Sequence, residues 1–119
     1  MFETIPYSQV TGANANNSVV ECYALRSDIS TIGEFTSSHP IINAIHQMEV
    51  NTFEANMMSI QSDCPHRERL GYGGDAHMTG ESFIMNYDMA LFYEKRVRDY
   101  NDAIRSNGTF VVFVRLNDA

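Results

Sequence analysis

The feature that most constrains the fold is a break between two segments of helical periodicity. Residues 62–74 contain Pro65 and three glycines, so we expect this stretch to be a loop. Before the break, Ile41, Ile45 and Met48 repeat at the spacing of one helix face. The pattern predicts a mainly helical fold in which helices hold a loop between them.

Two helices are predicted on either side of this loop. The first spans about 41–60, with Pro40 in its first turn and Ser38 as its N-cap. An unbroken helix of that length would be roughly 30 Å long. A short second helix is expected over 76–85.

A third helix is predicted from the most regular apolar spacing in the chain. It ends before Asn107-Gly108, a pair that stops helices. We expect several of its apolar side chains to face inward without packing partners and so to promote association of the isolated chain. We expect the methionines of the first helix, over 41–60, to pack in a core. The apolar positions of this helix are Met89, Tyr93, Val97, Tyr100 and Ile104.

Strands are expected toward both ends of the chain. Residues 2–12 and 18–25 have partly alternating or β-prone patterns, and residues 26–40 form an irregular connector. Residues 109–119 contain a β-prone apolar run that is either a strand or a segment foreign to the fold. We therefore expect strands near both ends of the chain and helices between them.

The composition excludes some classes of function. Hydrophobic residues make up 44% of the chain and charged residues 19%, which is ordinary for a folded protein. The net charge of −7 would repel a phosphate backbone, so we expect no nucleic-acid partner. No apolar run of about 18 residues and no export signal are visible, so we expect a soluble chain with no membrane partner and leave its compartment open.

The predicted loop concentrates groups that can do chemistry. Hydrolysis of a glycosidic bond needs a carboxylic acid that protonates the leaving oxygen, further carboxylates that hold ring hydroxyls, and an aromatic side chain that covers the ring. The segment DCPHRERLGYGGDA offers all of these within fourteen residues. Its groups are Asp63, Glu68 and Asp75, the basic or cationic His66, Arg67 and Arg69, and Tyr72.

Other interpretations of the loop are weaker but remain open. In a purely structural one, Asp63 caps a turn and Glu68 forms a solvated ion pair with Arg67 or Arg69. A metal site is disfavoured because His66 and His77 match no standard zinc spacing, so we expect neither metal nor cofactor.

The remaining polar candidates also favour ordinary roles. Cys64 is disfavoured as a nucleophile, since Pro65 follows it and no helix N-terminus lowers its pKa. Cys22 and Cys64 form no CxxC pair, so a zinc ribbon or dithiol motif is not indicated. Glu81 and Glu94 fall in helical stretches and are expected at a rim and on a solvated face.

Residues 63–76 resemble the signature of inverting α-L-rhamnosidases, in which a DCPxRERLGW-like stretch is followed by GDA. FTSSHPIINAI and FYEKRVRDYNDAIRSNG resemble flanking helical stretches of that family, so the resemblance covers roughly 30–108. It implies the start of an (α/α)6 toroid, with 29–119 as an incomplete N-terminal part of the catalytic domain. Residues 1–28, through IPYSQVTG and ECYALRSD, resemble the end of the preceding β-sandwich.

The resemblance also implies roles for loop residues. Glu68 matches the general acid, and Asp63 and Asp75 match carboxylates that hold rhamnose hydroxyls. Arg67 matches the arginine before the acid, and Tyr72 stands where many members have Trp, which keeps an aromatic wall. The family's second carboxylate, a Glu that activates water, lies farther along its chains and has no match here.

The implied function is hydrolysis of terminal α-L-rhamnose with inversion, acting on a rhamnose-containing oligosaccharide or glycoside. Because the base is unmatched, we expect this chain to be a fragment that is inactive in isolation. The alternative is a non-catalytic rhamnose-binding or carbohydrate-binding protein, or a decayed one, that kept the pocket loop. That alternative predicts weak rhamnose binding without hydrolysis.

Overall fold

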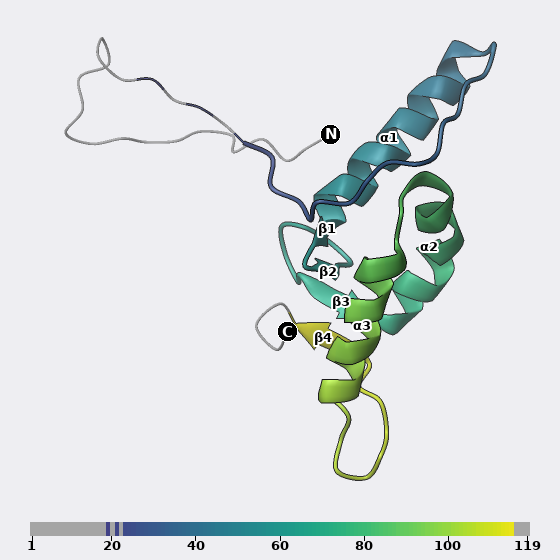
Figure 1. Ribbon diagram of the computed structural model, residues 1–119. Coiled ribbons are helices and arrows are strands. Elements are labelled where there is room, and N and C mark those ends of the chain that lie inside the picture. The colour runs from purple at the N-terminus through teal and green to yellow at the C-terminus, as the bar shows by residue number, and fades with distance from the viewer. Residues whose placement is uncertain (1–18, 20, 22, 116–119) are drawn as a thin grey trace.

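The fold is mainly helical, as predicted. The computed structural model describes residues 19, 21 and 23–115. Over these residues it contains three helices (Figure 1), and no helix among them is long and apolar enough to cross a bilayer. The helices are α1 (Pro40–Asn56), α2 (Gly73–Asn86) and α3 (Ala90–Asp102).

Four short strands form two antiparallel pairs that connect the helices. Strands β1 (Met57–Met58) and β2 (Ile60–Gln61) make a tight hairpin directly after α1. Strand β3 (Leu70–Tyr72) precedes α2 and pairs with β4 (Phe113–Arg115). The β-prone tail is therefore a strand up to residue 115, and the alternative that it is foreign to the fold is wrong.

Helix α1 ends four residues earlier than the predicted boundary at residue 60. Ser59 adopts a positive φ of 64°, which reverses the chain and lets Met58 pair with Ile60. The reversal turns Met57, which is 0% exposed, and Ile60 into the interior. A continued helix would not allow this pairing.

The start of α1 also differs from the prediction. Its N-cap is His39 rather than Ser38, and the cap makes no side-chain hydrogen bond to the helix. Order there comes from Asn43, which donates to the Ser37 carbonyl and accepts from the Ser37 backbone N–H, both at 2.8 Å. Ser37 Oγ also accepts a hydrogen bond from the His39 N–H at 3.1 Å.

The apolar stripe predicted for α1 is exposed in its first part and buried in its continuation through Phe53, Met57 and Ile60. Ile41, Ile45 and Met48 are each more than half exposed. The first turns of α1 project beyond the other two helices (Figure 1), so only its later turns reach the core. The prediction that the methionines of this helix pack in a core is right for Met57 and wrong for the exposed Met48 and Met58.

The core lies where the end of α1 meets α2 and α3. The rings of Phe53 and Phe83 stack with centroids 4.0 Å apart. Burial of such aromatic side chains is the main source of stability for a chain of this size. The buried cluster consists of Ile29, Phe53, Met57, Phe83, Tyr87, Met89 and Phe92, with Tyr93 packed against it.

The connector before α1 ties these parts together through its backbone. The Ser27 N–H donates to the Met57 carbonyl at 2.6 Å, and the Gly33 N–H donates to the Asn86 carbonyl at 3.1 Å. Between these two points Thr31 forms an antiparallel bridge with Tyr87. The irregular segment thus runs from the hairpin after α1 to the junction of α2 and α3.

The apolar face of α3 has more partners than predicted. Met89 is buried in the core, Tyr93 packs against it, and the Tyr100 hydroxyl donates to the Gly71 carbonyl at 2.6 Å. The expectation of missing partners is wrong for these three side chains and holds for Val97, which is 69% exposed. Helix α3 ends at Asp102, before Ile104 and the predicted stop at Asn107-Gly108.

The strands predicted near the N-terminus lie largely outside the described residues. The strand at 2–12 and residues 18, 20 and 22 of the second one are not described, and Cys22 is among them. Residues 19, 21 and 23–25 belong to no strand. The division at residue 28 therefore remains a prediction.

Candidate active site

The candidate loop runs from β2 to β3 and contains Pro65, but it is shorter than the predicted loop at 62–74, because Gly71 lies in β3 and Gly73 and Gly74 begin α2. Asp63 closes it, because its N–H donates to the Leu70 carbonyl and its Oδ1 accepts from the Leu70 N–H, both at 3.0 Å. The turn between them is secured by Arg69, whose Nε donates to the Pro65 carbonyl at 3.1 Å. Arg69 itself adopts a positive φ of 55°, which aims the chain into β3.

Cys64 takes part in the structure of the loop. Its Sγ donates to Asp63 Oδ2 at 3.3 Å and accepts from the Glu68 N–H at 3.2 Å. The second contact connects the backbone of the candidate acid to the strand end that carries Asp63. Both contacts favour the interpretation of Cys64 as a structural group rather than a nucleophile.

Hydrogen bonds hold Asp63 in its charged form. Partial burial raises the pKa of the carboxyl, but hydrogen bonds from the Leu70 backbone and from Cys64 outweigh it, so the pKa lies below its ordinary value. The carboxylate is therefore ionised wherever the protein works at ordinary pH. A permanently charged acceptor suits a residue that accepts hydrogen bonds from sugar hydroxyls.

The lowered pKa of Asp63 predicts an acid-sensitive loop. A carboxyl with a lowered folded-state pKa stabilises the fold fully above its ordinary pKa, and this contribution is lost as pH falls through the folded value. We expect the Leu70 amide to lose protection from hydrogen exchange below about pH 4. In Asp63→Asn the protection of the Leu70 amide should be lower at neutral pH and should change little as the pH falls below about 4. If the variant loses protection at low pH as the wild type does, the Asp63 carboxylate is not the cause.

Tyr72 contacts the candidate acid directly. Its hydroxyl donates to Glu68 Oε2 at 3.1 Å, and its ring meets Phe113 of β4 edge-on at 5.4 Å. The pKa of Tyr72 is raised, first by this hydrogen bond, then by desolvation and by the charges of Glu68, Asp63 and Asp75. The negative charges of three carboxylates therefore act on one phenol, which the sequence pattern alone did not show.

The other predicted residues lie at the edges of this group. Glu68 and Arg67 are exposed in the turn of the loop, and Asp75 is exposed in the first turn of α2. Helix N-termini favour negative charge, which suits Asp75 there.

The structural alternatives for charged residues have mixed outcomes. Arg69 uses its Nε on the Pro65 carbonyl, and Glu68 accepts from Tyr72. Glu94 lies on an exposed face of α3, as expected, and pairs there with Arg98. Among the described residues no group of three His, Cys, Asp or Glu side chains is placed to hold a metal ion.

The hydrogen-bonding residues that support the strands on either side of the loop were not predicted from the sequence. Gln61 is 3% exposed, and its side chain bonds both Thr79 and Arg96. Arg96 and Tyr100 of α3 donate to backbone carbonyls of β3. Gln61 lies between Ile60 and Ser62, and no local sequence pattern marked it.

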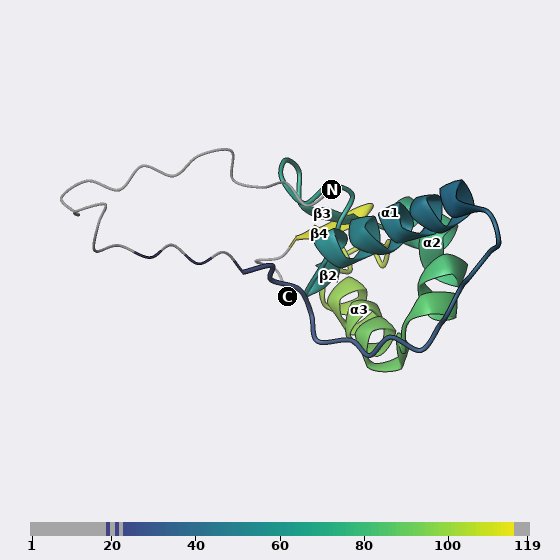
Figure 2. The ribbon, with the colours of Figure 1, turned by 90° about the horizontal axis from the view of Figure 1, so that it is seen from above.

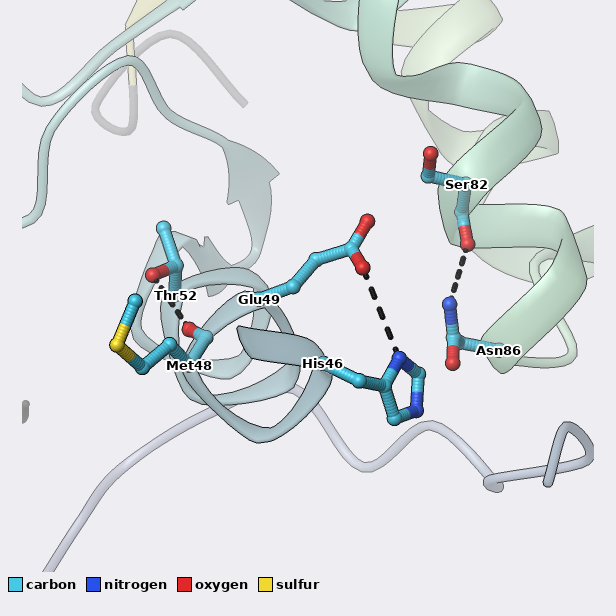
Figure 3. A network of polar contacts seen from close by, with 6 residues as sticks. All are labelled: His46, Met48, Glu49, Thr52, Ser82 and Asn86. Carbon is cyan, nitrogen blue, oxygen red and sulfur yellow. Dashed lines mark hydrogen bonds and ion pairs between the residues drawn. The ribbon is translucent and has the colours of Figure 1, made fainter. Parts of the chain in front are cut away.

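A cavity of about 430 Å³ lies elsewhere, between α1 and α2. Figure 3 shows His46 and Glu49 of α1 on its wall, with His46 Nδ1 3.7 Å from Glu49 Oε2, facing Ser82 and Asn86 of α2. None of the predicted site residues lines this cavity. The candidate site is instead the open surface of the loop.

Comparisons with known proteins agree with this geometry. Residues 30–115 match the family described as the bacterial alpha-L-rhamnosidase 6 hairpin glycosidase domain. Two curated relatives from Formosa agariphila, both named alpha-L-rhamnosidase, are 34% identical over 78% of this chain and 29% identical over 90% of it. The chain spans about a tenth of the length of these relatives, 10% and 12%.

Solved structures with the same local fold have the same name. An alpha-L-rhamnosidase from Dictyoglumus thermophilum superposes with a TM-score of 0.71 at 38% identity, covering 75% of this chain and 10% of its own. One from Streptomyces avermitilis, solved in complex with L-rhamnose, gives 0.72 at 28% identity, covering 75% and 9%. With most of its length matched by the family model, the chain belongs to the six-hairpin glycosidase domain family of bacterial α-L-rhamnosidases.

Proposed function

We propose that this chain supplies the acid-carrying part of an α-L-rhamnosidase that removes terminal α-L-rhamnose with inversion. The observation that carries the proposal is the loop, where Glu68 lies within hydrogen-bond distance of Tyr72 and the charges of Asp63 and Asp75 act on the same phenol. The name shared by the relatives and the bound rhamnose in one of the solved structures support the substrate class.

Each loop residue has a role in this proposal. Glu68 protonates the glycosidic oxygen, and its exposure lets a leaving group reach it. Asp63, Asp75 and Arg67 bind the sugar hydroxyls, while the ring of Tyr72 covers an apolar face of the sugar. A second carboxylate, about 6.5 to 9.5 Å away, activates the attacking water. We assign that base to a part of the full-length protein outside this chain.

The proposal extends to domain organisation. We propose that residues 1–28 belong to the end of a β-sandwich and that 29–119 belong to the catalytic barrel. The family match beginning at residue 30 supports this boundary. The small share of the relatives' length that the chain covers supports a longer protein as the active form.

The function is tested with the full natural length of the protein and 4-nitrophenyl α-L-rhamnoside. We expect release of nitrophenol, with β-L-rhamnose as the first anomer in a proton NMR time course, because inversion changes the configuration at the anomeric carbon. The β-D-glucoside serves as the control and should not be cleaved. Rhamnose binding without hydrolysis would instead support a non-catalytic carbohydrate-binding protein, and α-L-rhamnose as first product would exclude inversion.

A further inference from the structure

Two side chains of helix α3 donate hydrogen bonds to the backbone of strand β3, which follows the candidate loop. Arg96 Nη2 donates to the Tyr72 carbonyl at 2.9 Å, and the Tyr100 hydroxyl donates to the Gly71 carbonyl at 2.6 Å. Figure 1 shows β3 beside α3, with β4 paired to the strand. The peptide groups that precede and follow Tyr72 are therefore each held by a side chain of α3.

The guanidinium of Arg96 is itself held in one orientation. Its Nη1 donates to Gln61 Oε1 at 3.0 Å, and its centre lies 5.6 Å from the ring centroid of Tyr100. Gln61 is buried, so leaving its amide unpaired would cost about 1–3 kcal/mol. The guanidinium of Arg96 thus connects β2 to β3, because one Nη donates to Gln61 and the other to the Tyr72 carbonyl.

The same network continues to the other flank of the loop. Gln61 Nε2 donates to Thr79 Oγ1 at 2.6 Å, and the Thr79 hydroxyl donates to the Asp75 carbonyl at 2.7 Å. Asp75 lies in the first turn of α2, directly after β3. One arginine of α3 is therefore connected to the Tyr72 backbone directly and to the Asp75 backbone through Gln61 and Thr79.

We propose that Arg96 is a positioning residue that holds Tyr72, and through the Tyr72 hydroxyl the carboxylate of Glu68, in the geometry required for proton transfer. This inference rests on the proposed function. The Tyr72 hydroxyl lies 3.1 Å from Glu68 Oε2. Rotation of the peptide group after Tyr72 relative to the rest of that residue would move the phenol away from this carboxylate. A displacement of about 1 Å at a catalytic group can lower turnover about 100-fold.

Arg98 provides a matched control on the same helix. It lies two residues from Arg96, its side chain is 72% exposed, and it pairs with the exposed Glu94. Removing it deletes a guanidinium of equal size and charge without touching β3. Arg96→Lys is the second informative variant, because an ammonium keeps the charge but cannot reproduce the planar fork to two acceptors.

The test uses the full-length protein and two readouts for Arg96→Ala, Arg96→Lys and Arg98→Ala. The first is the titration of Tyr72, followed by NMR with labelled tyrosine and assigned with Tyr72→Phe. Because its pKa is raised first by the bond to Glu68, we expect it to fall toward its ordinary value in both Arg96 variants and to stay raised in Arg98→Ala. The second is kinetics: kcat should fall about 100-fold in Arg96→Ala with KM little changed.

The outcomes separate this inference from the proposed function. A folded Arg96→Ala protein that keeps either the wild-type Tyr72 titration or the wild-type kcat would overturn the positioning role. If Arg96→Ala does not fold, Arg96→Lys decides by the same criteria. If the wild-type protein hydrolyses no rhamnoside, the proposed function fails, and the Tyr72 titration alone still decides whether Arg96 holds Tyr72 against Glu68.

Discussion

Glu68→Gln in the full-length protein should lower kcat by about 100- to 10,000-fold on a rhamnoside with an alcohol leaving group, because general acid catalysis contributes this much. The loss should be smaller with 4-nitrophenyl rhamnoside. Nitrophenoxide is a stable leaving group that needs little protonation, whereas an alkoxide needs a proton in the transition state. This dependence on the leaving group is specific to the acid, and steady-state kinetics on the two substrates measures it.

The control for this substitution is Glu94→Gln. Glu94 is an exposed glutamate of α3 that pairs with Arg98, so losing its charge should leave both kcat values unchanged. The glutamine at residue 68 keeps an acceptor for the Tyr72 hydroxyl, and folding should therefore be retained. Near-normal turnover on the alcohol substrate, or an equal loss on both substrates, would remove Glu68 as the general acid.

Gly33→Ala should destabilise the fold by about 3 kcal/mol or more, at the upper end of overpacking effects. A Cβ at this position would lie 2.1 Å from the Met85 carbonyl oxygen and 2.9 Å from the Asn86 Cα. Both atoms belong to the backbone of α2, so neither can move without breaking the bond from the Gly33 N–H to Asn86. The connector would separate from the junction of α2 and α3.

Thermal unfolding of the 119-residue chain, followed by circular dichroism, measures the effect. A loss of 3 kcal/mol corresponds to a midpoint at least about 12 °C lower for a domain of this size. Gly74→Ala is the control, because a Cβ there meets no atom within 4 Å and alanine favours the helix. It should raise the midpoint slightly, and a similar midpoint for the two variants would contradict the close contact at Gly33.

The loop could be predicted as the candidate site because its signals are local. Pro65 and the glycines that follow interrupt the helical pattern, and the acidic and aromatic groups lie within fourteen residues. The helices before and after the loop were predicted from the same short stretches of chain, whereas the strands β2 and β3 next to it were not. The hydrogen bond between Tyr72 and Glu68 spans only four residues, yet it depends on the hydrogen bond between Asp63 and Leu70 that closes the loop.

The buried faces of the helices could not be predicted in the same way. Ile41 and Ile45 form an apolar face as regular as that of a core helix, but α1 presents it to solvent because its first turns project beyond α2 and α3. Conversely, Tyr100 was expected to lack a partner and instead donates to the Gly71 carbonyl of β3. Periodicity indicates that a face exists, and only the neighbouring elements decide what covers it.

The sequence by itself determined the mainly helical class, the position of the loop and the identity of its acidic groups, because these depend on residues near one another in the chain. Only the tertiary structure decided that α1 ends at Asn56, that the tail forms β4, and that Arg96 supports the loop. Arg96 and Gln61 are 35 residues apart, and no local pattern specifies a contact between them. Their meeting follows from how the helices and strands pack together.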